Sequence, residues 1–269
     1  MKLFVAMPQY GGSCWQTEVA INKLMREGVP FTQFIFKRLL GESNVVEARN
    51  GLTAHFLRSD CNRLLLMDSD MVFEPSQVAR IITHTEPVVG GIYSKKKPGE
   101  PDWCLQGLPG QARGVADARG LIEVDRIGTG FLCIHRSAFA LLEAELRLRH
   151  YWTQGGEQID FWFTEYAMAA DGKAWYQGED YSFSARWRGL GGKIFADAQV
   201  LVGHVGSMVF PDGWSERAGF GAQDGGQRTE DGGQGTEDRG QMTEDDVAGS
   251  SSAEMRPERS EFAPVLVGE

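Results

Sequence analysis

Short apolar runs alternate with helically spaced segments along the first 93 residues, and no other feature of the chain restricts its fold as strongly. The apolar runs predict strands at 2–7, 31–36, 63–67 and 87–93. Between them, apolar residues recur at helical spacing over 15–27, 45–58 and 76–83. Strands that alternate with helices predict an α/β fold, in which a mostly parallel central sheet is covered by helices on both faces.

The second half continues the same pattern after a loop-rich stretch that follows Tyr93. We expect strands at 120–124, 130–135 and 193–202, and a helix that begins soon after Asp180. A strong helical pattern covers 137–149, and Ser137 is a residue type that favours an N-cap.

The C-terminal region differs in composition from everything before it. From Gly225 it contains three seven-residue copies, GGQRTED, GGQGTED and RGQMTED, with almost no apolar side chain. Burial in such a segment cannot offset the entropy lost on ordering, and glycine stands where a coiled coil would need Leu or Ile. We therefore predict one folded domain over 1–215 and a disordered acidic tail over 216–269.

The net charge of −10 is concentrated in that tail. Residues 213–269 carry 13 acidic and 5 basic groups, which leaves 24 and 22 for residues 1–212. A nearly neutral body with an acidic end is a poor electrostatic match to a phosphate backbone, so nucleic acid is not an expected partner.

The four cysteines are scattered without CxxC spacing, so neither a zinc site nor a disulfide framework is indicated. Residues 1–6 lack the basic segment and long apolar run of a signal peptide. No apolar stretch approaches the length of a transmembrane segment. A cytoplasmic location, with the cysteines reduced, is the simplest expectation.

Asp68 and Asp70 follow directly after the apolar strand predicted at 63–67. Ligands of α/β sheets gather at the carboxyl ends of strands, and two carboxylates at i and i+2 suit a divalent cation that bridges a diphosphate. The alternative is that both aspartates merely cap the segment that follows.

The surrounding residues strengthen the first interpretation. Glu47-Ala48-Arg49-Asn50-Gly51 precedes the apolar strand, which ends in Asp68-Ser69-Asp70 and is followed by Glu74-Pro75. Together with Pro8-Gln9-Tyr10 after the first strand, this pattern resembles the GT-A fold glycosyltransferases, especially the family 2 type, over residues 1–210. The resemblance implies a GT-A fold and a nucleotide site, with the contributing residues Pro8, Tyr10, Arg49, Asn50 and Asp68. Gly11-Gly12-Ser13-Cys14-Trp15 departs from the acid-containing turn usual in this family, so the nucleotide base stays open.

The same resemblance assigns an acceptor side and a catalytic base. It implies that Gly128, Thr129 and Gly130 form an acceptor loop, although an ordinary tight turn explains the local sequence equally well. Asp180, with Glu179 beside it, stands where the family carries the base that deprotonates the acceptor hydroxyl. The alternative is an acidic pair that stabilises the start of a helix through its macrodipole.

His204 follows the last predicted strand, where many GT-A enzymes place a histidine that completes the metal site. The resemblance therefore implies that Asp68, Asp70 and His204 bind Mn²⁺ or Mg²⁺. A lone histidine after a strand can instead be purely structural.

Aromatic residues are frequent around 151–163, and Trp162 is an acceptor candidate because flat rings stack on sugars. Such aromatic residues more commonly form a core. Lys95-Lys96-Lys97 could meet a phosphate or an anionic lipid headgroup, although a short lysine run is usually a solvated loop.

These observations together predict a metal-dependent, hexosyltransferase-like glycosyltransferase. Asp180 as the base favours inversion, and a retaining course stays open because many retaining relatives share the DxD motif and the C-terminal histidine. The donor would be a UDP- or GDP-sugar, and the acceptor hydroxyl would belong to a glycan, a lipid or a protein. Two alternatives stay open: a nucleotidyltransferase that forms sugar nucleotides, and a non-catalytic carbohydrate-binding protein on the same scaffold. The first usually has a basic, glycine-rich loop after strand one, whereas no Lys or Arg follows Gly11 until Lys23.

Overall fold

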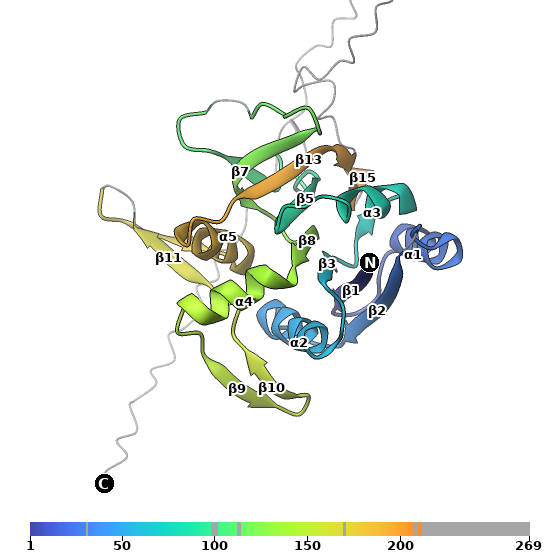
Figure 1. The fold of residues 1–269 in the computed structure, drawn as a ribbon, viewed down its shortest axis with the longest axis horizontal. Helices are drawn as coiled ribbons and strands as arrows, with labels where there is room; N and C mark the ends of the chain where they lie inside the picture. The colour runs from blue at the N-terminus through green and yellow to red at the C-terminus, as the bar shows by residue number, and fades with distance from the viewer. Residues whose placement is uncertain (31, 98–101, 112–113, 169–170, 207–208, 211–269) are drawn as a thin grey trace, which may run out of the picture. The chain divides into compact units, whose positions relative to one another are not determined.

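A computed structural model describes residues 1–30, 32–97, 102–111, 114–168, 171–206 and 209–210 of the chain (Figure 1). The chain divides into two units, Met1–Gln223 and Asp224–Glu269, and the second unit lies wholly outside the described residues. The predicted boundary at residue 216 and the tail beyond it also lie outside them, so both stay predictions.

An eight-stranded sheet forms the centre of the first unit (Figure 1). In spatial order its strands are β2 (Gln33–Leu40), β1 (Lys2–Gln9), β3 (Arg63–Met67), β8 (Phe131–His135), β5 (Val88–Ile92), β13 (Ile194–Leu201), β7 (Leu121–Ile127) and β6 (Leu105–Gly107). The pairing directions make β8 and β7 antiparallel to their neighbours, while the other strands all run the same way. The mostly parallel sheet is thus confirmed.

Helices cover both faces of this sheet, as the alternating pattern predicts. They are α1 (Trp15–Glu27), α2 (Val45–Arg58), α3 (Pro75–Ile81), α4 (Arg136–Glu145) and α5 (Glu179–Gly189). Alternate residues of β1 face opposite sides of the sheet. Phe4 and Ala6 belong to the core cluster that contains α2, α4 and α5. Leu3, Val5 and Met7 belong to the cluster that contains α1 and α3. Two buried faces explain why β1 and β3 are continuously apolar instead of alternating.

Three smaller sheets surround the central one. They contain β9 (His150–Thr153) with β10 (Gly156–Ile159), β11 (Glu165–Met168) with β12 (Ala174–Gln177), and β4 (Met71–Val72) with β14 (Gly203–Val205) and β15 (Val209–Phe210). The β9–β10 hairpin lies in the aromatic stretch around 151–163, and the β11–β12 hairpin follows it. The turn-favouring residues that the sequence offers for these hairpins are Gln154-Gly155, between β9 and β10, and Asp171-Gly172, between β11 and β12.

The structure corrects several local predictions. The helix predicted over 137–149 ends at Glu145, and the one predicted after Asp180 begins at Glu179. The second strand begins at Gln33 rather than at residue 31, because Thr32 forms an isolated bridge with Val29. The N-cap of α4 is His135 and not Ser137, since the His135 side chain accepts a hydrogen bond from the Ser137 amide. An imidazole nitrogen can accept a hydrogen bond from the unpaired amides at a helix start, as a hydroxyl oxygen does.

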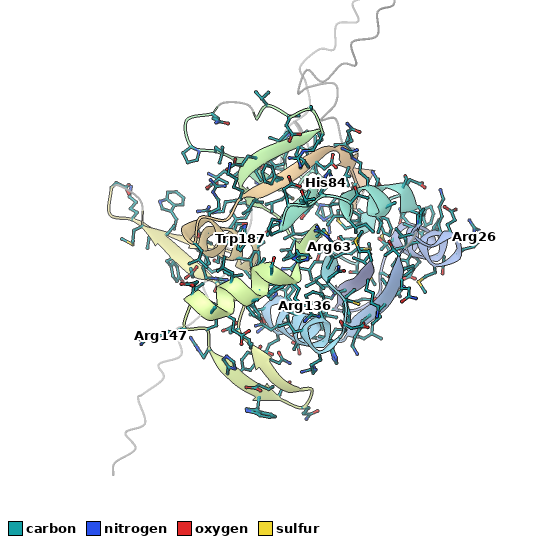
Figure 2. The ribbon with its side chains drawn as sticks, in the orientation of Figure 1. Arg26, Arg63, His84, Arg136, Arg147 and Trp187 are labelled. Carbon is teal, nitrogen blue, oxygen red and sulfur yellow. The ribbon has the colours of Figure 1, made fainter. Side chains whose placement is uncertain are left out.

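Arg136 secures the end of α2, where helix carbonyls lack internal partners. Figure 2 labels Arg136, the first residue of α4. Its guanidinium donates to the carbonyl oxygens of Phe56, Leu57, Ser59 and Cys61 at 2.7–2.9 Å. This fixes α2, which carries Arg49, against the core. Among the described residues, no helix has the length and apolar character needed to cross a membrane.

Candidate functional site

The candidate site forms where β3 ends. All five residues of β3 are buried, and the chain emerges at Asp68, whose amide donates to the carbonyl of Gly130 at 3.0 Å. The side chains of Asp68 and Asp70 are 30% and 29% exposed, so both reach the surface at this edge. Neither aspartate caps α3, because its capping residue is Glu74, which forms a capping box with Gln77. The capping explanation for the two aspartates is therefore wrong.

Arg49 joins three segments that are distant in the sequence. The Asn44 side chain caps the start of α2 by accepting a hydrogen bond from the Val46 amide. About one turn further along α2, the side chain of Arg49 is buried and points toward the end of β3. One nitrogen of Arg49 contacts Asp68 Oδ1 at 3.0 Å, and another pairs with Glu179 at the start of α5. The predicted Asp68 and Glu179 thus lie on either side of a single guanidinium.

Asp180 has a different environment from its neighbour Glu179. Burial, followed by the nearby Glu179 carboxylate, raises the pKa of Asp180 to about 6, although the Tyr181 amide donates to its Oδ1 at 2.7 Å and opposes the rise. A carboxylate placed only to stabilise a helix start would have its pKa lowered by the helix N-terminus. The direction of the shift is therefore opposite to the one that a helix start alone produces.

His204 and Asp70 face each other through the small sheet of β4 and β14. His204 pairs with Met71 in register, and the Val205 amide donates to the Asp70 carbonyl at 2.8 Å. The Nδ1 atom of His204 donates to the Ser94 carbonyl at 2.8 Å, which leaves Nε2 directed at Asp70 Oδ1, 3.5 Å away. A carbonyl only accepts hydrogen bonds, so this contact fixes the proton on Nδ1.

The Asp70 carboxylate has two distinct oxygens. Oδ2 pairs with the Lys96 ammonium, whereas Oδ1 is buried and accepts no hydrogen bond from the described residues. Burial acts to raise the pKa of Asp70, but the contacts with His204 and Lys96 outweigh it and lower the pKa. A neutral His204 would present the lone pair of Nε2 to Asp70 Oδ1, and both are donor atoms that a divalent cation accepts, whereas a protonated His204 would donate to that oxygen.

The three predicted metal ligands do not form one cluster. Within the described part of the chain, no group of three or more His, Cys, Asp or Glu side chains is placed to hold a metal ion. Asp70 and His204 converge, whereas Arg49 holds Oδ1 of Asp68. The orphaned oxygen of Asp70 and the orientation of the imidazole nevertheless fit a divalent cation.

A cavity of about 180 Å³ adjoins Asp68 and Asp70. Residues after β1, around the start of α2 and after β3 line it, among them Pro8, Tyr10, Arg49, Asp68 and Asp70. Four of the five residues predicted for the nucleotide, Pro8, Tyr10, Arg49 and Asp68, therefore surround one cavity.

Asn50, the fifth, was predicted wrongly. Its side chain is buried, donates to Asp160 at 2.8 Å, and accepts from the amides of Phe161 and Trp162 at 2.9 and 3.2 Å. These contacts connect α2 to the turn before β11 and leave Asn50 outside the cavity lining.

The predicted acceptor residues are largely structural. Gly130 donates to the Tyr93 hydroxyl at 2.7 Å, and a Cβ at this position would lie 2.8 Å from that hydroxyl and 3.2 Å from Asp68 Oδ2. A Cβ on Gly128 would lie closer still to the Tyr93 hydroxyl, and the Thr129 side chain is buried. The glycines thus allow Tyr93 to pack beside Asp68, and Thr129 cannot meet an acceptor directly.

Trp162 is not a sugar platform. It is fully buried, its ring stacks on Phe183 at 4.5 Å, and its indole nitrogen donates to Thr53 at 2.9 Å. The core interpretation of this aromatic residue is therefore correct, because a ring without exposed surface cannot stack on a ligand.

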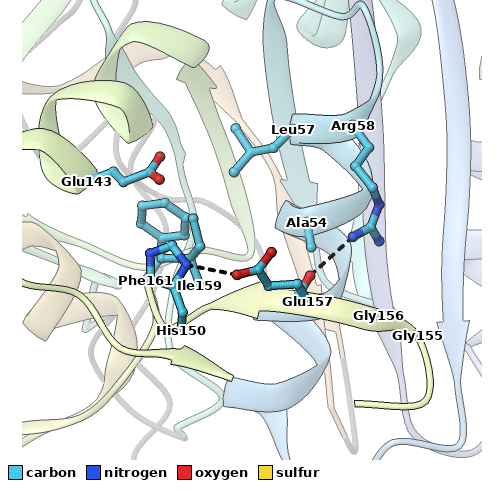
Figure 3. Close-up of a pocket in the computed structure, with 10 residues that line it drawn as sticks. All are labelled: Ala54, Leu57, Arg58, Glu143, His150, Gly155, Gly156, Glu157, Ile159 and Phe161. Carbon is cyan, nitrogen blue, oxygen red and sulfur yellow. Dashed lines mark hydrogen bonds and ion pairs between the residues drawn. The ribbon is translucent and has the colours of Figure 1, made fainter. Parts of the chain in front are cut away.

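A larger cavity, of about 520 Å³, lies elsewhere (Figure 3). It is bordered by Arg58 at the end of α2 and by the β9–β10 hairpin, where His150 pairs with Glu157 at 3.2 Å. None of the predicted site residues lines it. Its size alone gives it no place in the chemistry.

Neither a protein-family model nor a curated protein sequence matches the chain. Among solved structures, A197 from STIV is 17% identical over 76% of this chain and 86% of its own, with a TM-score of 0.47. GalNAc-T7, crystallised with UDP, GalNAc and Mn²⁺, is 13% identical over 75% of this chain and 44% of its own, with a TM-score of 0.43. A glycosyltransferase involved in glycosylation of the major capsid of PBCV-1 is 12% identical over 52% of this chain and 63% of its own, with a TM-score of 0.31.

Proposed function

We propose that this chain is a glycosyltransferase of GT-A type, which transfers a sugar from a nucleotide diphosphate donor to an acceptor hydroxyl. The observation that carries this proposal is the cavity lined by Arg49, Asp68 and Asp70. Arg49 joins Asp68 to Glu179, the neighbour of Asp180, and His204 faces Asp70. The nucleotide would occupy the cavity lined by Pro8, Tyr10 and Arg49.

The charge balance of the site supports a requirement for a divalent cation. Asp68, Asp70, Glu179 and Asp180 contribute four negative charges when ionised, and their direct partners Arg49 and Lys96 contribute two positive ones, which leaves −2. A diphosphate is itself anionic and would be repelled by such a site. A divalent cation that binds together with the nucleotide removes this repulsion.

Asp70 and His204 would hold that cation, Mn²⁺ or Mg²⁺, and Asp68 would line the nucleotide beside it. When bound, the cation supplies Lewis-acid stabilisation of the leaving diphosphate. The chain's own contribution is to keep the His204 ring oriented through Ser94 and to hold Asp68 in place through Arg49.

Asp180 would act as the general base. Its carboxylate would accept the proton of the acceptor hydroxyl while the hydroxyl oxygen attacks the anomeric carbon, which inverts the configuration there. Arg49 neutralises Glu179, whereas burial and the neighbouring Glu179 charge increase the basicity of Asp180. Of the acidic pair, Asp180 is therefore the better base.

Incubation with UDP- and GDP-sugars in the presence of Mn²⁺ tests the proposal, with release of the nucleoside diphosphate as the readout. A glycosyltransferase releases UDP or GDP from at least one donor, and the release rises when the acceptor is supplied. A nucleotidyltransferase would instead produce pyrophosphate from a nucleoside triphosphate and a sugar phosphate. A non-catalytic carbohydrate-binding protein would give neither product.

A further inference from the structure

The lysine run after β5 does not behave as one solvated loop. Lys95 pairs with Asp102 at 3.0 Å, and both side chains are nearly half exposed. Lys96 instead turns to Asp70 and pairs with its Oδ2. The second lysine of the run therefore reaches the carboxylate that also faces His204.

We propose that Lys96 is a ligand of the donor diphosphate, and that its ion pair with Asp70 is the arrangement it holds before donor and cation bind. This inference depends on the proposed function and adds a substrate-binding residue to it. In the free protein, the ammonium of Lys96 neutralises one oxygen of Asp70 and keeps the carboxylate charged.

A divalent cation at Asp70 would make this ion pair unfavourable. The cation would lie within a few ångströms of the ammonium, where repulsion between like charges is strong. Lys96 would then leave Asp70, and the diphosphate carried by the same cation is an anion within reach of its long, flexible stem. An ammonium on such a stem is suited to binding phosphate as a point charge.

The loop around Lys96 is fixed at its base, so only the side chain has to move. The Lys95 amide donates to the Asp102 carbonyl at 2.6 Å, and the Cys104 amide donates to the Tyr93 carbonyl at 3.0 Å. The Ser94 carbonyl also accepts the His204 Nδ1 proton, so the same loop orients the imidazole.

Arg49 is less suited to this role. Its side chain is 5% exposed and is already divided between Asp68 and Glu179, whereas the Lys96 side chain is 37% exposed and pairs with one acid, Asp70, among the described residues. Moving Arg49 to a phosphate would leave two carboxylates without their cation. Moving Lys96 leaves only Asp70, which the divalent cation then neutralises.

The test compares Lys96→Met with Lys95→Met as the matched control, because Lys95 is the neighbouring lysine with an ion pair away from the site. Calorimetry measures Mn²⁺ binding alone, and then binding of UDP and of GDP at saturating Mn²⁺. Lys96→Met should bind Mn²⁺ alone about 2–5-fold more tightly, because the competing ammonium is gone. It should bind the nucleotide about tenfold more weakly, because a charge-assisted contact is lost. Lys95→Met should change neither affinity by more than about twofold.

Lys96→Arg retains the charge and should restore most of the nucleotide affinity. Unchanged nucleotide affinity in Lys96→Met, or an equal loss of Mn²⁺ and nucleotide affinity, would overturn the role of Lys96 while leaving the proposed function intact. If the wild-type chain binds neither Mn²⁺ nor a nucleotide, the proposed function itself is refuted, and the role of Lys96 with it. Melting curves of all variants identify any that fails to fold.

Discussion

Replacement of Asp180 by Asn gives the sharpest separation of chemistry from binding. The amide keeps the shape of the side chain but cannot accept the acceptor's proton, so transfer should fall by about 10²–10⁴-fold, the usual contribution of general acid–base catalysis. Donor affinity should remain nearly unchanged, because the residues that line the nucleotide cavity do not include Asp180.

The pKa of Asp180 also predicts a pH profile. With a pKa of about 6 in the folded chain, the carboxylate is the major form at neutral pH and the minor form at pH 5. Transfer by the wild-type protein should therefore rise about tenfold from pH 5 to pH 7 and then level off. The residual activity of Asp180→Asn should lack this rise.

The same substitution should stabilise the fold at neutral pH. The pKa of Asp180 is raised from 3.8 to about 6, so between these values the native carboxyl holds a proton that the unfolded chain has released. The free energy of unfolding therefore falls as pH rises through this window, by at most about 3 kcal/mol. Asn does not titrate, so Asp180→Asn should be more stable than wild type above pH 6 and similar to it near pH 4.

Nucleotide-release kinetics and urea unfolding at pH 4 and pH 7 measure both effects. Asp171→Asn is the matched control, because this exposed aspartate pairs only with Lys173 in the described residues and should change neither activity nor stability. Transfer within tenfold of wild type, or a loss of stability at pH 7, would refute the assignment of Asp180 as the base.

Two further predictions concern residues outside the chemistry. Asn50→Ala should lower the free energy of unfolding by about 2–4 kcal/mol, because it leaves the buried amides of Phe161 and Trp162 without acceptors, and nucleotide affinity measured on the folded variant should not change. A large loss of nucleotide affinity would contradict the structural role of Asn50. Truncation after Arg217 should shift the melting temperature by no more than a few degrees, since the repeats lack apolar side chains to bury; a large drop would show that the tail packs on the domain.

The sequence predicted the elements of the fold well where two buried faces impose a continuous apolar run. Helices α1 and α2 and strand β3 begin and end at the predicted residues, because their periodicity and caps are local properties. The β9–β10 and β11–β12 hairpins were missed. Their strands are short and largely exposed, so no alternating pattern marks them.

The candidate site was predicted in part, and the errors have a common cause. Strand ends and helix starts are visible in the sequence, so the positions of Asp68 and Asp70 after β3 and of Asp180 in the first turn of α5 were predicted correctly, while their roles stay predictions. Whether a side chain faces the cavity or the core depends on tertiary packing, which the local sequence does not show. The predictions for Asn50 and Trp162 failed for this reason, because both side chains are buried.

For Lys95-Lys96-Lys97 the sequence leaves open a contact with a phosphate or an anionic headgroup and a solvated loop, and nothing local distinguishes Lys96 from Lys95. Its pairing with Asp70 arises from the way the loop after β5 passes the end of β3, which no short-range pattern encodes.

The measurement that tests the central claim most directly is calorimetric binding of UDP and GDP, with and without Mn²⁺, to the wild-type chain and to Asp70→Asn. We expect the wild-type chain to bind one of the two nucleotides only when Mn²⁺ is present. Asp70→Asn, which retains the fold but loses the carboxylate that faces His204, should lose this Mn²⁺-dependent binding. Binding that is equally tight in the variant, or that is independent of Mn²⁺ in the wild-type chain, would contradict a metal-diphosphate site at the end of β3.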